Sequence, residues 1–471
     1  MPAVRDRYAP SPTGALHLGG ARTALFNCLF ARQKQGQFLL RIEDTDRARL
    51  KEGSQALIEE GLKWLGIGWD EPPLVQSERK PIYQEAAELL LASGGAYRCF
   101  CTPERLNEMR AEQRARKEPE RYDRRCRSVS REEAERRAAA GERNVIRQAI
   151  PLEGVTTLND LVMGTVTFQN ATLDDHVLMK SDGYPTYHLA FAVDDHASRI
   201  SHVIRGDGWL PSAPKHLLLF MAFGWDPPAF AHLPLVLGAD KKPLAKRHGA
   251  KDVLEYRDAG YLPEAVVNFI AFLGWSPGTT EDILTMEQLI ERFSIEKIQP
   301  SPAMANLERL DWLNGQFIRR LEPAELARRI AERMTGVPVE KLVPLIPLVQ
   351  ERLRTLNEAS DMLQFFFTDP DGYSPNQLVP KGRDTVQTGE ALGQVRDALK
   401  PLSQWSVDVL EPVLRSTAEQ LGWPARDLFM ALRVAITGRT VTPPLIESMS
   451  HLGKARVLDR LERAAKAITD V

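Results

Sequence analysis

Cysteine is scarce in this chain: four occur in 471 residues, so a disulfide framework is not expected. No apolar run approaches the roughly 18 residues that a membrane-spanning helix needs, and the N-terminus lacks the apolar stretch of a signal peptide. We therefore expect a cytoplasmic protein with no membrane contact. The net charge is only −2, so any RNA would have to be bound through local basic patches rather than through the overall field.

The sequence also lacks internal repeats and low-complexity segments, and its second half contains no further Gly-rich nucleotide loop. A chain of 471 residues is too long for one hydrophobic core, so about two to four domains are expected. The content of hydrophobic residues (43%) and of charged residues (26%) is typical of globular proteins.

The most informative stretch begins at the N-terminus, where residues 4–9 predict a strand that leads into a turn and a helix over about 18–34, with Gly36 as its stop signal. Free N–H groups and a positive dipole end at the helix start favour an anion, and His17 can donate to a phosphate there. Strand–Gly–helix alone fits an ordinary β-turn-α unit equally well. The motif that favours a nucleotide site comprises Pro10, Ser11, Pro12, Thr13, Gly14, His17, Leu18, Gly19 and Gly20.

The next segments predict a βαβα pattern and hence a parallel sheet, with a strand over 37–43, a helix over 54–65 capped by Ser54, and a helix over 81–94. Ligands bind at the carboxyl ends of such strands, so Glu43 is placed to meet a cationic substrate group. An acidic loop that caps the next helix is the alternative, and it fits Asp44 and Asp46 about as well.

From about Tyr97 the chain becomes rich in arginine, with helix starts at Thr102–Pro103 and at a capping box over 130–133. The arginines suggest phosphate contacts, whereas interleaved glutamates would pair many of them. An RNA-facing surface and a solvated charged face both remain open. The basic residues are Arg105, Arg110, Arg114, Arg116, Lys117, Arg121, Arg124, Arg125 and Arg127.

After short strands over 145–180, a buried strand at 202–205, a helix over 211–223 and a strand over 230–237 return the chain to the parallel sheet. Arg205 stands at a carboxyl edge and needs an anionic partner. That partner is either Asp194 or Asp195, or a substrate carboxylate held by a bidentate fork. The cationic loop at 240–249 is typical of a phosphate clamp only in combination with the first motif. From residue 263 onward the pattern is almost wholly helical.

Six segments, in order, resemble the glutamyl-tRNA synthetases, a family of class I aminoacyl-tRNA synthetases, over essentially the whole chain. Residues 10–20 resemble the HIGH region; residues 41–46, 183–190, 203–206 and 437–445 match the same family. The stretches at 41–44 and 184–187 narrow the resemblance to the glutamyl branch. The KMSKS-like segment comprises Pro243, Leu244, Ala245, Lys246 and Arg247.

The resemblance implies an α/β N-terminal half, with a Rossmann-type parallel sheet and an inserted α+β domain, and an all-α C-terminal half of helical anticodon-binding domains. The implied domains are residues 1–80 (first half of the Rossmann catalytic domain), 81–184 (inserted acceptor-binding domain), 185–240 (second half of the Rossmann domain), 241–320 (KMSKS loop and stem-contact helices), 321–375 and 376–471 (two anticodon-binding domains).

The implied activity is that of a glutamate–tRNA ligase, which makes glutamyl-adenylate from glutamate and ATP and passes the glutamyl group to the 3′-terminal adenosine of tRNA(Glu). The implied cofactors are ATP and Mg²⁺. The expected protein is a monomer that binds no DNA. A non-discriminating or duplicated form that charges tRNA(Gln), and a degenerate paralogue that only binds RNA, are the alternatives. The helical half argues against a shorter enzyme that glutamylates an anticodon base and against a small-molecule nucleotidyltransferase.

Carried over residue by residue, the resemblance assigns ATP binding to His17, the Gly19 backbone and Lys246, and makes His17 and Lys246 the catalytic pair. It assigns the α-amino group of glutamate to Ser11 and Glu43. The carboxylates of glutamate fall to Arg7, Tyr187 and Arg205.

Five positions depart from the family pattern. Gly20 stands for the last histidine of HIGH, and Pro243 and Ala245 stand for the first lysine and the serine of KMSKS. Phe191 replaces a pocket asparagine, and Gly208 replaces an acidic residue near the ATP ribose. These changes predict altered tRNA choice or slower chemistry.

Three of the four cysteines are clustered. Cys99, Cys101 and Cys126 supply three of the four ligands that structural zinc takes. Some family members complete such a site with a histidine, at a position that is Ser128 here, and others with a tyrosine four residues before the last cysteine, which Tyr122 matches. Zinc and three reduced, buried cysteines are the two alternatives.

Overall fold

The computed structural model describes residues 3–244, 251–370, 372–373 and 375–469. Its internal contacts divide the chain into two units. The first comprises Met1–Asp258 and Pro263–Arg309, and the second comprises Ala259–Leu262 and Leu310–Val471. Each unit is described below by itself.

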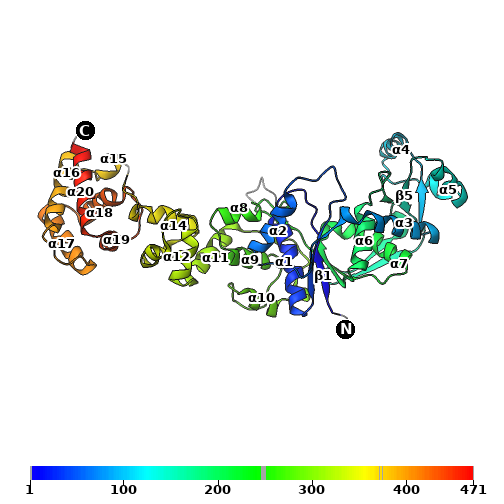
Figure 1. Cartoon of the computed structure of the whole chain (residues 1–471), viewed down its shortest axis with the longest axis horizontal. Coiled ribbons are helices and arrows are strands. Elements are labelled where there is room, and N and C mark those ends of the chain that lie inside the picture. Colours follow the sequence, from blue (N-terminus) through cyan, green and yellow to red (C-terminus); the bar gives the residue numbers. More distant parts are fainter. Residues whose placement is uncertain (1–2, 245–250, 371, 374, 470–471) are drawn as a thin grey trace. The chain divides into compact units, whose positions relative to one another are not determined.

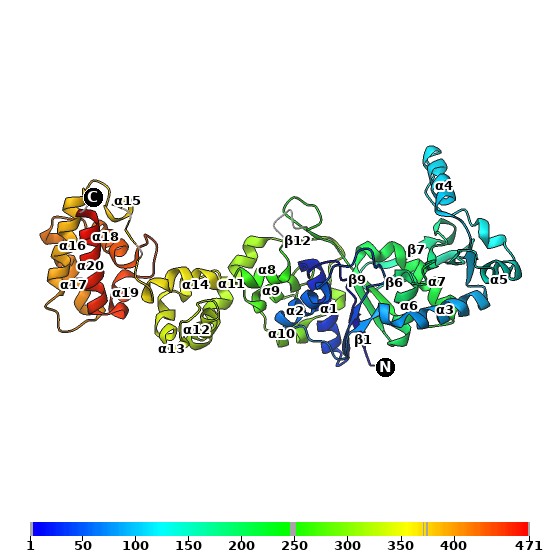
Figure 2. The same ribbon diagram turned by 45° about the horizontal axis from the view of Figure 1, so that its top comes forward.

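The first unit is built on parallel strands. In one sheet β2 lies between β1 and β3, and in the other the order is β7-β6-β10-β9. The backbone N–H of Ser201 donates to the carbonyl of Arg5 at 2.8 Å, so β1 lies beside β9 and the two sheets are continuous (Figure 2). The predicted parallel α/β sheet is therefore confirmed. Its strands are β1 (Arg5–Tyr8), β2 (Gln37–Ile42), β3 (Leu74–Val75), β6 (Val155–Asp160), β7 (Gly164–Gln169), β9 (His202–Gly206) and β10 (Ala229–Leu233).

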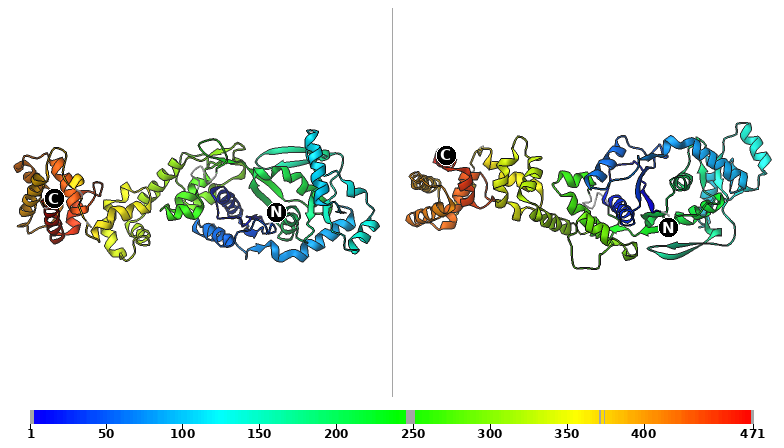
Figure 3. Two further views of the ribbon diagram at one scale, coloured as in Figure 1. Left: turned by 90° about the horizontal axis from the view of Figure 1, so that it is seen from above. Right: turned by 60° about the horizontal axis from the view of Figure 1, so that its bottom comes forward.

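Helix α1 (Leu18–Gln33) packs on this sheet against β1, β2 and β9. In Figure 3 the blue N-terminal segment accordingly lies against the green segment that contains β9. Gly36 ends the connection to β2, where a Cβ atom would lie 2.2 Å from the carbonyl oxygen of Val4. Only glycine fits such a close backbone approach. Further helices and short strands of this unit are α2 (Ser54–Trp64), α8 (Val253–Asp258), α9 (Pro263–Ala271), α10 (Met286–Arg292), β11 (Val236–Leu237) and β12 (Ala303–Met304).

A second, antiparallel sheet of order β4-β5-β8 comes from the stretch of sequence between the two halves of the parallel fold. The hairpin β6–β7 comes from the same stretch of sequence but extends the parallel sheet, because Asp160 of β6 pairs with Phe230 of β10. The elements around the antiparallel sheet are α3 (Lys80–Ser93), β4 (Ala96–Cys99), α4 (Pro103–Ala115), α5 (Arg131–Ala139), β5 (Val145–Gln148) and β8 (Val177–Met179).

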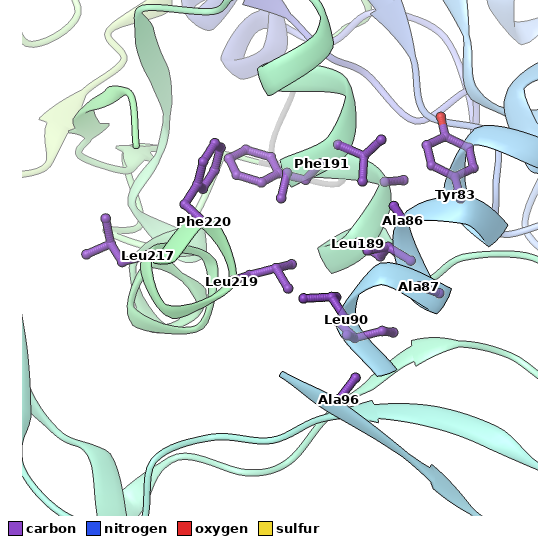
Figure 4. Packing of buried hydrophobic residues seen from close by; sticks show 14 of the residues in the cluster. Tyr83, Ala86, Ala87, Leu90, Ala96, Leu189, Phe191, Leu217, Leu219 and Phe220 are labelled. Atoms are coloured by element: carbon purple, nitrogen blue, oxygen red, sulfur yellow. The ribbon is translucent and has the colours of Figure 1, made fainter. Parts of the chain in front are cut away.

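Helices α3, α6 (Tyr187–Ala197) and α7 (Ala213–Phe223) share one hydrophobic core. Figure 4 shows Leu90 of α3 facing Leu219 of α7, with Phe191 and Phe220 meeting above them. Phe191 is fully buried. This core fixes the start of α6, where Tyr187 lies.

The described residues of the second unit form helices joined by loops and no strand, which confirms the predicted helical half. Helices α16, α18 and α19 pack against the last helix, α20 (Figure 1). Arg460 of α20 is fully buried and donates to the carbonyl oxygens of Ile436 and Phe365. The helices are α11 (Leu307–Arg320), α12 (Pro323–Ala331), α13 (Val339–Leu342), α14 (Leu356–Leu363), α15 (Pro375–Leu378), α16 (Thr385–Leu399), α17 (Val407–Gln420), α18 (Ala425–Thr437), α19 (Leu445–Leu452) and α20 (Lys454–Thr469).

Some local predictions were wrong. Ser54 does not cap α2: the N-cap is Gly53, whose φ of 76° lets the chain turn into the helix, and Ser54 is the first helical residue. The strand predicted over 230–237 is divided into β10 and β11 by Pro234, which cannot donate to a strand ladder. The helix predicted from Pro211 begins at Ala213, after a 3-10 turn.

Among the described residues, no helix combines the length and the hydrophobicity that crossing a bilayer requires.

Candidate active site

A cavity of about 420 Å³ opens where β1, β2 and β9 end. Its wall draws on segments that lie up to about 200 residues apart in the sequence. The structure thus brings together six of the residues to which the resemblance assigns ATP or glutamate binding, although Gly19 is not among the lining residues, and their individual roles stay predictions. The six are Arg7, Ser11, His17, Glu43, Tyr187 and Arg205.

His17 is the N-cap of α1, and its Nδ1 accepts a hydrogen bond from the backbone N–H of Gly20 at 3.0 Å. One of the N–H groups expected to face a phosphate is therefore already bonded. An imidazole that accepts at Nδ1 carries its proton on Nε2, so Nε2–H is the donor that His17 can offer. A Cβ atom on Gly20 would lie 2.6 Å from the hydroxyl of Tyr8. A side chain at position 20 would therefore require the ring of Tyr8 to move.

Two buried arginines beside the cavity share one carboxylate. Arg7 donates to both oxygens of Asp195, at 2.9 and 3.2 Å. Arg41 contacts Asp195 as well and donates to Glu43 at 2.9 Å. Burial by itself would raise the pKa of Asp195, but Arg41 and Arg7 lower it overall. Glu43 therefore has a cationic partner within the protein, and burial raises its pKa despite Arg41 and Arg7.

Arg205 differs from these two arginines because its hydrogen-bond acceptors are all neutral. Its Nε donates to Nε2 of His232 at 3.0 Å and its Nη1 to the Tyr187 hydroxyl at 2.9 Å. Of the two aspartates considered as its partner, Asp195 is occupied by Arg7 and Arg41, and Asp194 by the groups described next. Within the described part of the chain, no carboxylate forms an ion pair with Arg205, and burial lowers its pKa.

Asp194 has no part in holding Arg205. It accepts hydrogen bonds from Gln76 at 2.8 Å, from Arg79 at 3.0 Å and from the hydroxyl of Tyr83 at 2.7 Å. Neither of the two protein carboxylates that we considered therefore neutralises Arg205. The remaining alternative for the anionic partner of Arg205 is the carboxylate of a substrate bound in the cavity.

Phe191 forms an aromatic layer beneath the arginines. The guanidinium carbons of Arg7 and Arg205 lie 5.4 and 5.2 Å from the centre of its ring, within the range of cation–π attraction. The ring of His216 also stacks on Phe191, with ring centres 4.2 Å apart. Phe191 therefore contacts two cations, where an asparagine would offer a hydrogen bond. Tyr187 lies beside Phe191 as well, with ring centres 5.7 Å apart, and Trp209 packs on Tyr187 at 4.5 Å.

The KMSKS-like segment is only partly described. Leu244 donates its N–H to the carbonyl of Val236, and the carbonyl of Lys242 accepts from Gly238. Ala245, Lys246 and Arg247 lie outside the described residues, so the role of Lys246 remains a prediction. A Cβ on Gly208 would meet no atom within 4 Å, so packing does not require glycine there.

The sequence did not identify Arg41, Asp160, His216 or His232 as part of the site. A charged residue inside an otherwise apolar strand, as Arg41 is in β2, signals a buried ion pair and could have been found. No comparable pattern marks the two histidines, because their contacts depend on tertiary packing alone.

The cysteine cluster assembles as predicted. The Sγ atoms of Cys99, Cys101 and Cys126 all lie within 4.8 Å of one another. The Tyr122 hydroxyl lies 3.3 Å from the sulfur of Cys99 and 3.4 Å from that of Cys101. Hydrogen bonds from Cys99 and Tyr122 lower the pKa of Cys126, which favours the thiolate that metal ions bind. Ser128 is bonded elsewhere, to the carbonyl of Arg125.

Many arginines around α4 are paired with carboxylates. Arg105 binds Asp123, Arg114 binds Glu120 at 3.0 Å, and Arg116 binds Glu118 at 3.1 Å. Exposed pairs of this kind contribute little stability, but they reduce the positive field that would attract RNA. This pattern favours the solvated charged face at these three positions.

Comparison with known proteins gives the same picture as the geometry. Residues 3–312 match the catalytic domain of class I tRNA synthetases (E and Q), and residues 316–465 match an anticodon-binding domain. The chain is 45% identical to a glutamate–tRNA ligase of Dehalococcoides mccartyi over 485 aligned residues, which cover 99% of this chain and 98% of that protein. It is 44% identical to the glutamate–tRNA ligase of Herpetosiphon aurantiacus, again over 99% and 98% of the two chains.

Among solved structures, the glutamate tRNA ligase of Elizabethkingia meningosepticum, in complex with its amino acid, superposes with a TM-score of 0.87 at 35% identity. The match covers 99% of this chain and 100% of that one. The chain therefore belongs to the glutamyl-tRNA synthetases, the class I enzymes that use ATP to ligate glutamate to tRNA.

Proposed function

We propose that the cavity holds glutamate and ATP side by side, with glutamate bound between Glu43 and Arg205. The observation that carries this assignment is the neutral surroundings of Arg205. Its charge is not offset by a direct ion pair within the described residues, although the side chain is buried. A substrate carboxylate supplies the missing anion, and Arg7 and Tyr187 reach the same space. Ser11 and Glu43 line the wall that would receive the α-amino group.

ATP is assigned to the adjoining start of α1. We assign the phosphates to the Nε2–H of His17 and to the backbone around Gly19, and we assign Lys246, which lies outside the described residues, the role of the positive group that binds them. Members of this class use ATP with Mg²⁺, and a bound Mg²⁺ would offset the negative charge of the ATP phosphates while the adenylyl group is transferred. The residues of this chain supply position and charge rather than a covalent nucleophile.

In the first step an oxygen of the glutamate α-carboxylate attacks the α-phosphorus of ATP. A new P–O bond forms, the bond to the bridging oxygen of the diphosphate breaks, and diphosphate leaves with that electron pair. In the second step a ribose hydroxyl of the terminal tRNA adenosine attacks the activated carbonyl and forms an ester bond. The bond from that carbonyl carbon to the phosphate oxygen breaks, AMP leaves with the electron pair, and the hydroxyl proton is released to solvent. Both steps need close alignment of reactants more than they need acid–base chemistry from the protein.

The assignment of Arg205 is tested with Arg205→Ala and Arg205→Lys, measured by charging of tRNA(Glu) and by ATP–diphosphate exchange with tRNA present. We expect the KM for glutamate to rise at least about 100-fold in Arg205→Ala, because a charge-assisted bidentate contact is lost. The KM for ATP should change less than threefold. Exposed Arg199, in a turn before β9, provides the matched control as Arg199→Ala. An unchanged KM for glutamate would refute the assignment.

For the RNA substrate we propose tRNA(Glu). Charging purified tRNA(Glu) and tRNA(Gln) separately with labelled glutamate distinguishes a discriminating enzyme from one that also or mainly charges tRNA(Gln). Release of AMP in the presence of glutamate, ATP and tRNA excludes a degenerate paralogue that only binds RNA. We further propose that the protein is a cytoplasmic monomer, which sedimentation velocity and cell fractionation test.

We also propose a structural zinc ion held by Cys99, Cys101, Cys126 and Tyr122. Three sulfur atoms and one phenol oxygen converge there, and four such donors suit tetrahedral zinc. Zinc would hold the turn after β4 against the segment at 122–126. Metal analysis of the purified protein should give one zinc per chain, reduced to background in Cys99→Ser. A parent protein with well under one zinc per chain contradicts the proposal and favours three reduced cysteines.

The division of roles along the chain is likewise a proposal. The antiparallel β4-β5-β8 region would contact the acceptor end of tRNA, and the two groups of helices before and after about residue 375 would read the anticodon. The family match over 316–465 supports the second part. Chemical footprinting of bound tRNA(Glu) on each region tests both.

A further inference from the structure

Asp160, His232 and Arg205 form a row across three neighbouring strands. In the sheet order β6-β10-β9, Asp160 ends β6, His232 lies in β10 and Arg205 lies in β9. His232 and Arg205 are register partners in the parallel pair, so their side chains leave the sheet on the same face. All three side chains are buried.

Asp160 is held as a carboxylate by several donors. Its Oδ1 accepts from the backbone N–H groups of His232, Val162 and Met163 at 3.1, 3.0 and 2.9 Å. Its Oδ2 lies 2.6 Å from Nδ1 of His232. Burial alone would raise the pKa of Asp160, but the bonds from His232 and the backbone lower it overall.

An ionised carboxylate can only accept a hydrogen bond, so the proton of His232 must lie on Nδ1. Arg205 donates its Nε–H to Nε2 of His232 at 3.0 Å, so Nε2 carries a lone pair and the ring is neutral. The lowered pKa of His232, which burial causes despite the nearby carboxylate, agrees with this state. A second histidine can accept from Arg205 in the same way, because Nδ1 of His216 lies 3.3 Å from Nη1 of Arg205.

We propose that Asp160 and His232 are positioning residues for glutamate, and that Asp160 acts by fixing the tautomer of His232 so that it accepts from Arg205. This inference rests on the proposed role of Arg205 as a ligand of a glutamate carboxylate. The neutral imidazole of His232 separates the Asp160 carboxylate from Arg205, and this separation is the essential feature. A carboxylate in direct contact with Arg205 would compete with the substrate, whereas a neutral acceptor orients the guanidinium and leaves its charge available.

The decisive variant is Asp160→Asn. Its side-chain oxygen can keep the three backbone bonds, while its NH₂ group now donates toward Nδ1 of His232. That change moves the imidazole proton to Nε2. Two donors, Nε2–H of His232 and Nε–H of Arg205, then face each other, and the hydrogen bond between them is lost. We expect the KM for glutamate to rise at least tenfold, while the KM for ATP and kcat at saturating glutamate stay within threefold of the parent. Exposed Asn159 on the same strand gives the matched control, Asn159→Ala, with all constants unchanged.

Two further readouts separate positioning from a general structural role. The ¹⁵N spectrum of histidine-labelled protein should show His232 with its proton on Nδ1 in the parent and on Nε2 in Asp160→Asn, with His232→Gln identifying the signal. In the His232→Gln background, where an amide oxygen replaces the imidazole acceptor and no tautomer exists, Asp160→Asn should raise the KM for glutamate less than twofold.

The outcomes distinguish this inference from the proposed function. If Arg205→Ala raises the KM for glutamate but Asp160→Asn does not, the positioning role is wrong and the assignment of Arg205 stands. If Arg205→Ala leaves that KM unchanged, the assignment itself fails. If circular dichroism shows that Asp160→Asn does not fold, the ¹⁵N spectrum of the parent protein tests the proposal instead. A proton on Nε2 of His232, or a doubly protonated ring, in that spectrum overturns the proposal.

Discussion

Arg7 and Asp195 form a two-pronged ion pair, with distances of 2.9 and 3.2 Å, between residues 188 positions apart in the sequence. Arg41 contacts the same carboxylate. One aspartate thus contacts two buried guanidinium groups at the wall of the proposed glutamate pocket, and Glu43 supplies a second negative charge to Arg41. The arrangement makes the pocket dependent on a residue that does not line the cavity.

Replacing that aspartate should be costly. In Asp195→Asn the two arginines lose their shared counter-ion, and breaking a buried ion pair from one side typically costs about 3–5 kcal/mol. We expect a clear drop in melting temperature by calorimetry. Asp46→Asn is the control, because that carboxylate is exposed and 3.9 Å from Arg49. Equal melting temperatures for the two variants would contradict the proposed dependence.

Asp6 should make stability depend on pH. It is fully buried in β1, and neither of its oxygens has a hydrogen-bond partner within the described structure. Burial raises its pKa well above the usual range, although Arg7 and Arg32 oppose this. Above the unfolded pKa of about 4, the folded state keeps a proton that the unfolded state loses. The free energy of unfolding therefore falls as pH rises toward the folded pKa.

The variant Asp6→Asn removes this dependence, since an amide does not titrate. Urea unfolding of parent and variant at pH 5, 7 and 8.5 measures it. The variant should gain stability over the parent as pH rises, by at most about 1.4 kcal/mol per pH unit for one proton. A difference that stays constant over this range would show that Asp6 does not titrate on unfolding.

Gly20 should resist replacement. In Gly20→Ala the new methyl group meets the Tyr8 hydroxyl at 2.6 Å, and such overpacking typically costs about 1–3 kcal/mol. Removing that hydroxyl relieves the clash, so Tyr8→Phe should recover much of the lost stability in the double variant. Gly208→Ala is the control, because its Cβ would meet open space. Additive losses for Gly20→Ala and Tyr8→Phe would exclude the contact as the cause.

Phe191 should not be replaceable by the asparagine usual in the family. The variant Phe191→Asn removes a fully buried ring that packs on His216 and beneath Arg7 and Arg205. We expect a loss of about 3 kcal/mol or more, as for large-to-small changes in a core. Phe191→Leu separates size from aromatic character and should cost less. Thermal melting measures both, and an asparagine variant as stable as the parent would contradict the packing argument.

Lys246→Ala should lower adenylate formation at least ~100-fold, as the loss of a transition-state charge contact can. Lys242→Ala tests whether the neighbouring lysine shares this role, as the departures at Pro243 and Ala245 suggest. ATP–diphosphate exchange in the presence of tRNA measures both variants. An exchange rate for Lys246→Ala within a few-fold of the parent would exclude the clamp.

Sequence patterns predicted the positions of the helices and strands and the residues around the cavity better than the hydrogen-bond partners of its buried side chains. The glycine and proline signals between Pro10 and Gly36 placed α1 to within a residue, because backbone rules act locally. The partner of Arg205 was left open among Asp194, Asp195 and a substrate, because nothing local tells which carboxylate a distant arginine meets. The capping role predicted for Ser54 was wrong although it depends on local structure. Gly53, with its positive φ, occupies the N-cap position where a polar residue is usual.

The shared counter-ion has a consequence for synthesis on the ribosome. Chains grow from the N-terminus, and domains tend to fold as they emerge, so β1 and β2 are available long before Asp195. If these strands were buried at once, Arg7 would lie in the interior without its anion, which is unfavourable, and Arg41 would have Glu43 alone. We therefore expect this wall of the cavity, although it is built from the first residues of the chain, to become stable only after α6 has been translated.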